Sequence, residues 1–178
     1  MRDYYLLADD SRMAQKVVPS GLGLQKEDTF EQLPPISVLE VNADGAQAYT
    51  DWLEKPLPMI SERMKAITAK YNPSIQWKRV DLIDSESNLR NVYWAMQVPA
   101  VDCLSIETDF HLNGTVKRLV LDTDKIKAHH FFKVQGILEP YIVVSLDAAE
   151  SFLRRSLNGF VLQKVEQHCG GSYDDLLG

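Results

Sequence analysis

Only two segments of this chain repeat apolar residues at the 3.6-residue period of a helix, and this scarcity limits how much helix the fold can contain. In residues 56–73, the side chains of Ile60, Met64, Ile67 and Tyr71 recur at spacings of four, three and four residues. Such spacing places them on one face of a helix. The second segment, near the C-terminus, is shorter, so most of the chain must form strands and loops.

Residues that favour helix ends flank both segments. Pro58 predicts the entry of the first helix, since proline is well tolerated in the first turn. In the second segment, residues 145–159, either Ser145 or Asp147 is a suitable N-cap, and Gly159 is a suitable left-handed stop. The apolar face of this helix is predicted to consist of Leu146, Ala149, Leu153 and Leu157.

The other apolar residues fall in short extended runs. Strands are predicted over residues 4–8, 36–41, 75–83, 91–111, 118–122, 131–134, 141–145 and 160–165, and residues 9–35 are predicted to be mainly loop. Pro99 should interrupt the longest run. Asn113-Gly114 is typical of a type I′ hairpin turn, which would set Asp109 opposite Arg118 as a cross-strand ion pair.

Hairpin signals therefore outnumber the βαβ crossovers that parallel sheets require. This pattern predicts an α+β fold, with a mostly antiparallel β-sheet and a few helices packed on one face. A chain of 178 residues is of ordinary size for one domain, so we expect residues 1–178 to form a single unit. A semi-independent C-terminal lobe over residues 115–167 is the alternative, and residues 168–178 are predicted to be a mobile tail.

Charge and cysteine content restrict the function classes. The net charge of −6 disfavours binding to nucleic acid or to an anionic membrane surface, and it favours a partner with a basic surface. Only two cysteines, Cys103 and Cys169, are present, and there is no signal-peptide pattern. We therefore expect a cytoplasmic protein that needs no disulfide to fold.

No motif in the sequence predicts an enzyme or a cofactor. Nucleophile elbows, nucleotide-binding glycine loops, zinc-protease motifs and calcium loops are all missing from the sequence. The pair His129-His130, with Asp122 or Asp124, is the alternative: a small enzyme or ligand-binding site could assemble around it. His168 and Cys169 form only a fragment of a zinc site, because zinc generally takes four ligands.

Acidic and aromatic side chains are the candidates for partner contact. One acidic cluster follows a predicted strand, a second precedes the histidine pair, and a tryptophan lies in the long extended run between them. The predicted partner-binding residues are Asp81, Asp84, Glu86, Asp122, Asp124 and Trp94. Carboxylates would meet a basic partner, and an exposed tryptophan is a common anchor of interfaces.

Three stretches carry a resemblance to a known family. They are DYYLLADD at the start, PPISVLEV near residue 36, and the run LVLDTDKIKAHHFFKVQGILEPYIVVSLDAAESFLRRSLNGFVLQKVE. The chain resembles immunity proteins of bacterial polymorphic toxin systems, in the group named after a myxobacterial immunity domain. This resemblance implies a cytoplasmic protein that binds and neutralises a cognate toxin domain, with no catalytic residues of its own. A structural or regulatory module unrelated to toxins remains an alternative, and homodimerisation is left open.

Overall fold

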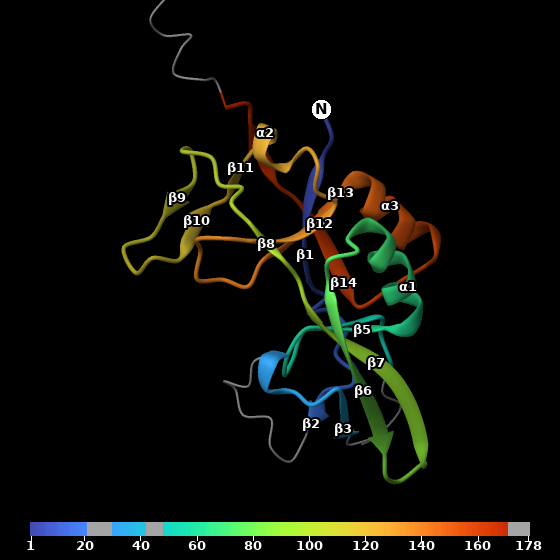
Figure 1. The fold of residues 1–178 in the computed structure, drawn as a ribbon. Helices are drawn as coiled ribbons and strands as arrows, with labels where there is room; N and C mark the ends of the chain where they lie inside the picture. The colour runs from blue at the N-terminus through green and yellow to red at the C-terminus, as the bar shows by residue number, and fades with distance from the viewer. Residues whose placement is uncertain (21–29, 42–47, 171–178) are drawn as a thin grey trace, which may run out of the picture.

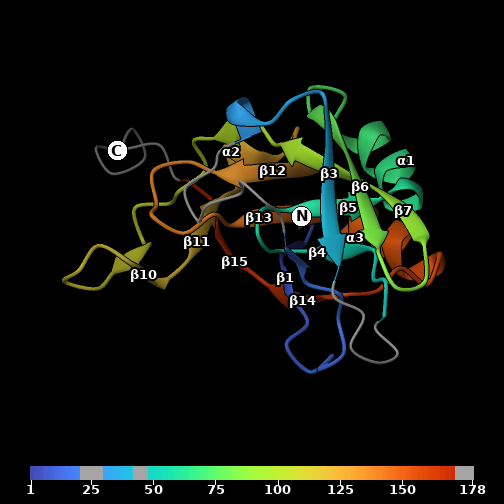
Figure 2. The same cartoon turned by 90° about the horizontal axis from the view of Figure 1, so that it is seen from below.

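A computed structural model describes residues 1–20, 30–41 and 48–170 of the chain and shows two main sheets. The six-stranded sheet forms the lower part of the molecule in Figure 1 and the five-stranded sheet lies above it, and Figure 2 shows the molecule from below, with the six-stranded sheet in front. The five-stranded sheet has the order β14 (Phe160–Lys164), β1 (Tyr4–Asp9), β13 (Ile142–Ser145), β12 (Phe131–Val134) and β8 (Ala100–Val101). The six-stranded sheet has the order β2 (Pro19–Ser20), β3 (Ile36–Val41), β6 (Gln76–Asp84), β7 (Leu89–Gln97), β5 (Met59–Ser61) and β4 (Trp52–Leu53).

Two strand pairs and the helices complete the described part of the chain. The pairs are β9 (Asp109–Phe110) with β10 (Val116–Arg118), and β11 (Val120–Asp122) with β15 (Glu166–His168). The helices are α1 (Glu62–Tyr71), α2 (Thr123–Ile126) and α3 (Leu146–Arg154), with a 3₁₀ turn at Phe30–Gln32. α1 and α3 lie side by side against the strands (Figure 1). The α+β class is confirmed.

The prediction of a mostly antiparallel sheet is only partly correct, because the sheets are mixed. β3 pairs with β6 in parallel, and so do β8 with β12 and β11 with β15. The partners in each of these pairs are far apart in the sequence. Local turn signals identify hairpins such as β12–β13, whereas parallel pairing between distant strands leaves no local signal.

The first helix begins later than Pro58 suggests. Ser61 is its N-cap, and the Ser61 hydroxyl accepts a hydrogen bond from the Met64 backbone N–H. The preceding residues, including Ile60, form β5, which pairs with β7. Ile60 and Met64 are nevertheless both fully buried. The helical spacing therefore identified core residues correctly, although the first of them belongs to a strand.

The second predicted helix starts at Ser145 as expected, because the Ser145 hydroxyl accepts the Ala148 N–H. Its apolar face agrees only in part with the predicted one: Ala149 and Leu157 are buried as predicted, but Leu153 is exposed, and Ala148 and Phe152 are buried in addition. Phe152 packs against the rings of Phe131 and Phe160, and this aromatic contact fixes the rotation of the helix. Two residues after the helix have positive φ: Ser156, at 53°, comes first, and the predicted Gly159, at 96°, follows three residues later.

The hairpin between β9 and β10 also differs from the prediction. Only Gly114 has positive φ at its turn, so the turn is not of type I′, which requires positive φ at both central residues. The Gly114 N–H bonds the His111 carbonyl, and the strand register shifts before Arg118. Asp109 and Arg118 are strand partners as predicted, but the Arg118 guanidinium pairs with Glu166.

Among the described residues, buried apolar side chains form three cores. The central core joins both main sheets to α1 and α3, and includes Trp52 and Ile60 from one sheet and Phe131 and Val144 from the other. The second core lies beneath the six-stranded sheet, and the third lies beyond the five-stranded sheet, near α2. The choice between one unit and a semi-independent lobe over 115–167 stays a prediction.

The predicted loop and tail extend outside the described residues. Residues 21–29, within the predicted loop, and residues 171–178, within the predicted tail, are not among them. The described beginning of the tail includes His168, which ends β15. In the described part of the chain, no helix has both the length and the apolar character needed to span a membrane.

Candidate functional site: an open face of the six-stranded sheet

Three neighbouring strands of the six-stranded sheet place nine side chains on one face. The strand registers align them in three rows across β3, β6 and β7, because paired residues point to the same side. The rows are Ile36, Arg79 and Trp94; Val38, Asp81 and Val92; and Glu40, Ile83 and Arg90. These nine residues are called the open face here; on the same side of the sheet, α1 packs against β5 and β7.

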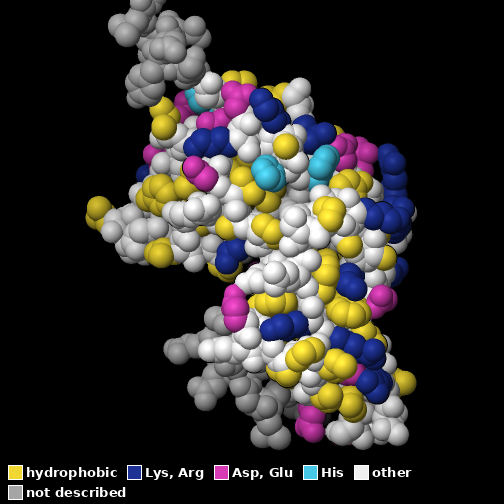
Figure 3. Space-filling view, in the orientation of Figure 1, with side chains coloured by type: hydrophobic (Ala, Val, Ile, Leu, Met, Phe, Trp, Pro, Cys, Tyr) yellow, Lys and Arg dark blue, Asp and Glu magenta, His cyan; other side chains and the backbone are white. Residues whose placement is uncertain are grey.

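The open face exposes apolar side chains of a kind that other parts of a protein ordinarily cover. Ile36 and Val38 each retain 58% of their accessible surface. Figure 3 shows hydrophobic side chains mixed with Lys and Arg over this part of the molecule, where β6 and β7 run in Figure 1. Apolar surface framed by cationic and aromatic groups is typical of protein-binding sites. The opposite side of the same strands is covered by the second core.

A buried carboxylate lies at the centre of the open face. Asp81 is 0% exposed, and its two oxygens accept separate hydrogen bonds, one from Arg79 Nε at 2.9 Å and one from an Arg90 terminal amino group. Burial by itself would raise the pKa of Asp81, but the hydrogen bonds from both guanidinium groups outweigh it and lower the pKa below its usual value. Asp81 is therefore ionised at neutral pH and anchors two arginines.

This anchoring predicts how stability depends on pH. The pKa of Asp81 is lower in the folded chain than the value of about 3.9 expected when unfolded. The carboxylate thus stabilises the fold above that value, and its contribution is lost as pH falls through the lowered folded pKa. We expect the difference in unfolding free energy between the wild type and Asp81→Asn to be largest near neutral pH. It should shrink steadily below about pH 4, as followed by urea denaturation. A difference that stays constant from pH 7 to pH 2 would contradict the ion-pair role.

An aromatic group with fixed neighbours borders the arginines. The Trp94 indole N–H donates to the Glu62 carboxylate, and the Lys65 ammonium lies 3.6 Å from the centre of the Trp94 ring. The same ammonium lies 5.7 Å from the Trp77 ring. Cation–π contacts of this kind hold a ring in one orientation. Trp94 is half-buried, so one side of its ring packs on α1 while the rest stays accessible.

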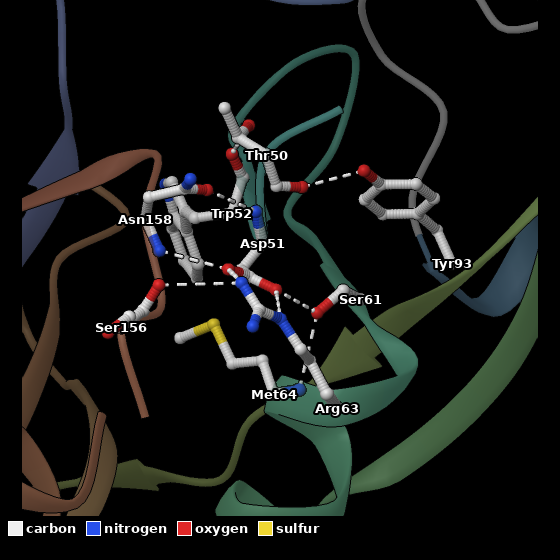
Figure 4. A network of polar contacts seen from close by, with 9 residues as sticks. All are labelled: Thr50, Asp51, Trp52, Ser61, Arg63, Met64, Tyr93, Ser156 and Asn158. Atoms are coloured by element: carbon white, nitrogen blue, oxygen red, sulfur yellow. Dashed lines mark hydrogen bonds and ion pairs between the residues drawn. The ribbon is translucent and has the colours of Figure 1, made fainter. Parts of the chain in front are cut away.

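The start of α1, which carries Glu62 and Lys65, is fixed by a network around Asp51 (Figure 4). The Asp51 carboxylate is buried and accepts two hydrogen bonds from Arg63, both at 2.7 Å, and one from the Ser61 hydroxyl at 2.6 Å. The Asn158 backbone N–H donates to it as well, at 2.9 Å. Asp51 thereby ties the helix to the loop that follows α3.

Comparison with known protein families adds an independent finding. Residues 4–167 match the model of Imm11, described as an immunity protein family. The chain belongs to this immunity protein family. A search of curated proteins finds no match. Family membership therefore confirms the resemblance seen in the sequence, while the contact residues must be inferred from the structure itself.

Of the six predicted contact residues, two lie together on the open face of this Imm11 protein. Asp81 and Trp94 lie in adjacent rows of the open face. Asp84 is buried at the end of β6, where it accepts hydrogen bonds from Ser87 and the Glu86 N–H, and Glu86 is exposed in the hairpin loop. Their role in partner binding stays a prediction.

The other two predicted carboxylates lie at the far end of the Imm11 chain. Asp122 caps the short helix α2 by accepting the Asp124 N–H at 3.0 Å, and Asp124 is exposed beside Lys127. Figure 1 shows α2 at the opposite end of the molecule from the β6–β7 hairpin. One contact surface of ordinary size would not include both ends, so these two residues form a separate prediction.

The two histidines of the predicted site contact different residues. His130 Nδ1 lies 2.8 Å from the Ser145 hydroxyl, and the His129 ring packs against Phe132. Burial, and then the nearby Arg2, lower the pKa of His130. Within residues 1–20, 30–41 and 48–170, no three His, Cys, Asp or Glu side chains are grouped to hold a metal ion, and this includes His168 and Cys169.

Sequence reasoning missed Ile36, Val38, Arg79 and Arg90 as site residues. The signal for the first two was present: residues 36–41 carry apolar side chains on both faces, so apolar and polar residues do not alternate cleanly. Leu39 and Val41 face the second core, whereas Ile36 and Val38 face outwards. A strand that is apolar on both sides is typical of strands that are covered on both sides, either within the chain or by a partner.

Proposed function

We propose that this Imm11 protein neutralises a cognate toxin domain by binding it through the open face. Family membership supports an immunity role, and the exposed Ile36 and Val38 beside anchored arginines and Trp94 support the site. The observation that carries the proposal is this juxtaposition, because tryptophan and arginine with neighbouring apolar groups dominate the energetics of protein interfaces. The protein then acts by covering the toxin, without catalytic chemistry of its own.

The cytoplasm of a bacterium with a polymorphic toxin system is the proposed setting. Both cysteines are free thiols, and burial raises the pKa of Cys103 to about 11, so this thiol stays protonated and unreactive at neutral pH. Such thiols agree with a reducing compartment.

The experiment that tests this function uses the toxin domain encoded beside the gene of this chain. Co-purification scores the complex, and growth of cells that express the toxin scores neutralisation. We expect a stable complex and restored growth. Absence of both, with the toxin shown to be folded and active, would refute the proposed function.

A second candidate function, self-association, is favoured by a projecting arm. The arm comprises residues 105–118 and the neighbouring Leu138, and it extends to the side of the molecule in Figure 1. It exposes four large apolar side chains, from Ile106, Phe110, Leu112 and Leu138. A two-stranded hairpin has little stability alone, so contact between two arms would both cover these side chains and stabilise the hairpin.

The arm makes a separate prediction. If two copies associate through it, the wild type sediments as a dimer at high protein concentration. The variant Leu112→Asp then sediments as a monomer, because each dimer would have to bury a carboxylate in an apolar contact. Analytical ultracentrifugation of both proteins measures this. A wild type that stays monomeric at every concentration would eliminate self-association.

A further inference from the structure

The open face contains two arginines whose positions are set by one buried acid. Arg79 and Arg90 both bond Asp81, which is itself inaccessible to solvent. Each guanidinium has five N–H donors in a fixed plane. Among the described residues, each uses only one of them on a protein acceptor, and both side chains remain partly exposed. Unused donors therefore remain on both sides of the Asp81 anchor.

Resting on the proposed function, we infer that Arg79 and Arg90 form a receptor for a carboxylate that the toxin domain presents within an apolar patch. Arginine pairs with carboxylates through two parallel hydrogen bonds, and an arginine already held by Asp81 loses little side-chain freedom on binding. Val38 lies beside Asp81 in the same row and supplies apolar contact around the incoming acid. The partner group is thus an Asp or Glu side chain with apolar neighbours.

This inference reverses the expectation that net charge gives. A chain of net charge −6 favours a basic partner. At the open face, however, the central acid is buried beneath Arg79 and Arg90, which are both partly exposed, and the accessible acid among the nine residues is Glu40. Glu40 lies on β3, one row away from Asp81 and on the far side of Ile83 from Arg90, and Glu62 accepts the hydrogen bond of the Trp94 indole. Local charge at the contact, and not the average over the surface, decides which groups meet there.

A direct test compares three proteins for binding to the toxin domain encoded beside this gene. Replacing the arginines alone would leave the buried Asp81 carboxylate without a positive partner. The first variant is therefore the triple Arg79→Gln/Asp81→Asn/Arg90→Gln, which removes the charges of all three residues. We expect it to bind at least about 30-fold more weakly than the wild type, with a weaker dependence on salt concentration. The control Arg154→Gln removes an exposed positive charge from α3 and should bind like the wild type.

A fourth protein tests the forked geometry. The variant Arg79→Lys/Arg90→Lys keeps both charges but cannot form paired hydrogen bonds, so we expect it to stay well below wild-type affinity. Thermal unfolding confirms that each variant is folded. If the triple variant binds within about threefold of the wild type and with the same salt dependence, the carboxylate receptor is excluded while the proposed function stands. Full affinity of the lysine variant would exclude a role for the paired hydrogen bonds that only arginine can form. If the wild type itself does not bind the toxin domain, the proposed function is refuted, and the carboxylate receptor, which rests on it, is refuted with it.

Discussion

Replacing Val38 by glutamate lowers the affinity for the toxin domain by at least about 100-fold. The Val38 side chain points outwards from the open face, 58% exposed, so the unbound fold loses little when it changes. In the complex, the new carboxylate would be buried in an apolar contact. It would also occupy the Arg79 and Arg90 donors that the partner requires. Isothermal titration with the toxin domain encoded beside this gene measures the loss.

A closely matched control comes from α3. Leu153 is 59% exposed, is also apolar, and lies on the outer side of the helix, away from the open face. Leu153→Glu should bind the toxin domain within about twofold of the wild type, because exposed substitutions outside an interface have small effects. If Leu153→Glu weakens binding and Val38→Glu does not, the contact surface lies elsewhere.

Replacing Asp51 by alanine removes about 3 kcal/mol of folding stability. The buried Asp51 carboxylate accepts hydrogen bonds from Arg63, Ser61 and the Asn158 N–H, and its loss leaves these donors without their acceptor. Arg63 is partly exposed and can be solvated, which keeps the loss below that of a fully buried pair. For a chain of this length, the melting temperature should fall by roughly 6–12 °C in thermal denaturation.

An exposed acid provides the comparison. Asp102 forms an ion pair with Lys125, but the Asp102 side chain is 74% exposed and that of Lys125 is 42% exposed. Asp102→Ala should therefore cost less than about 0.5 kcal/mol. A loss below about 1 kcal/mol for Asp51→Ala would show that the network in Figure 4 is not a main support of the start of α1.

The elements that sequence predicts well are those whose signals are local. The strand at residues 36–41 and the pair of strands at 131–134 and 141–145 form as expected, and Ser145 caps the second helix. Each of these depends on neighbouring residues: an extended apolar run, a turn, or a hydroxyl three residues before a free N–H. The α+β class follows from the same local signals.

Two of the predictions that failed depend on distant contacts. The parallel pairing of β3 with β6 joins strands that are separated by β4, β5 and α1. The rotation of α3 is set by Phe152 against Phe131 and Phe160, so the spacing of leucines alone selected Leu153 wrongly. Because such contacts are made only in the folded chain, periodicity within one segment cannot reveal them.

The same reasoning explains the site. Asp81 and Trp94 could be selected by residue type, since acids and tryptophans often contact partners. Their neighbours Arg79, Arg90 and Val38 become visible only through the register of three strands, which aligns residues from distant parts of the sequence. The hydrogen bonds of the folded chain also show that the buried Asp81 carboxylate anchors two arginines. An acidic residue in a sequence does not by itself indicate such a role.

Hydroxyl-radical footprinting of the complex tests most directly whether the open face binds the toxin. Oxidation of surface side chains is compared, by mass spectrometry, between this protein alone and the protein saturated with the toxin domain. We expect Ile36, Val38 and Trp94 to become protected on binding, while Leu153 on α3 and Leu112 on the arm keep their reactivity. Unchanged reactivity of the open face in a fully formed complex would show that the toxin binds elsewhere, most clearly if the protected residues were those of the arm.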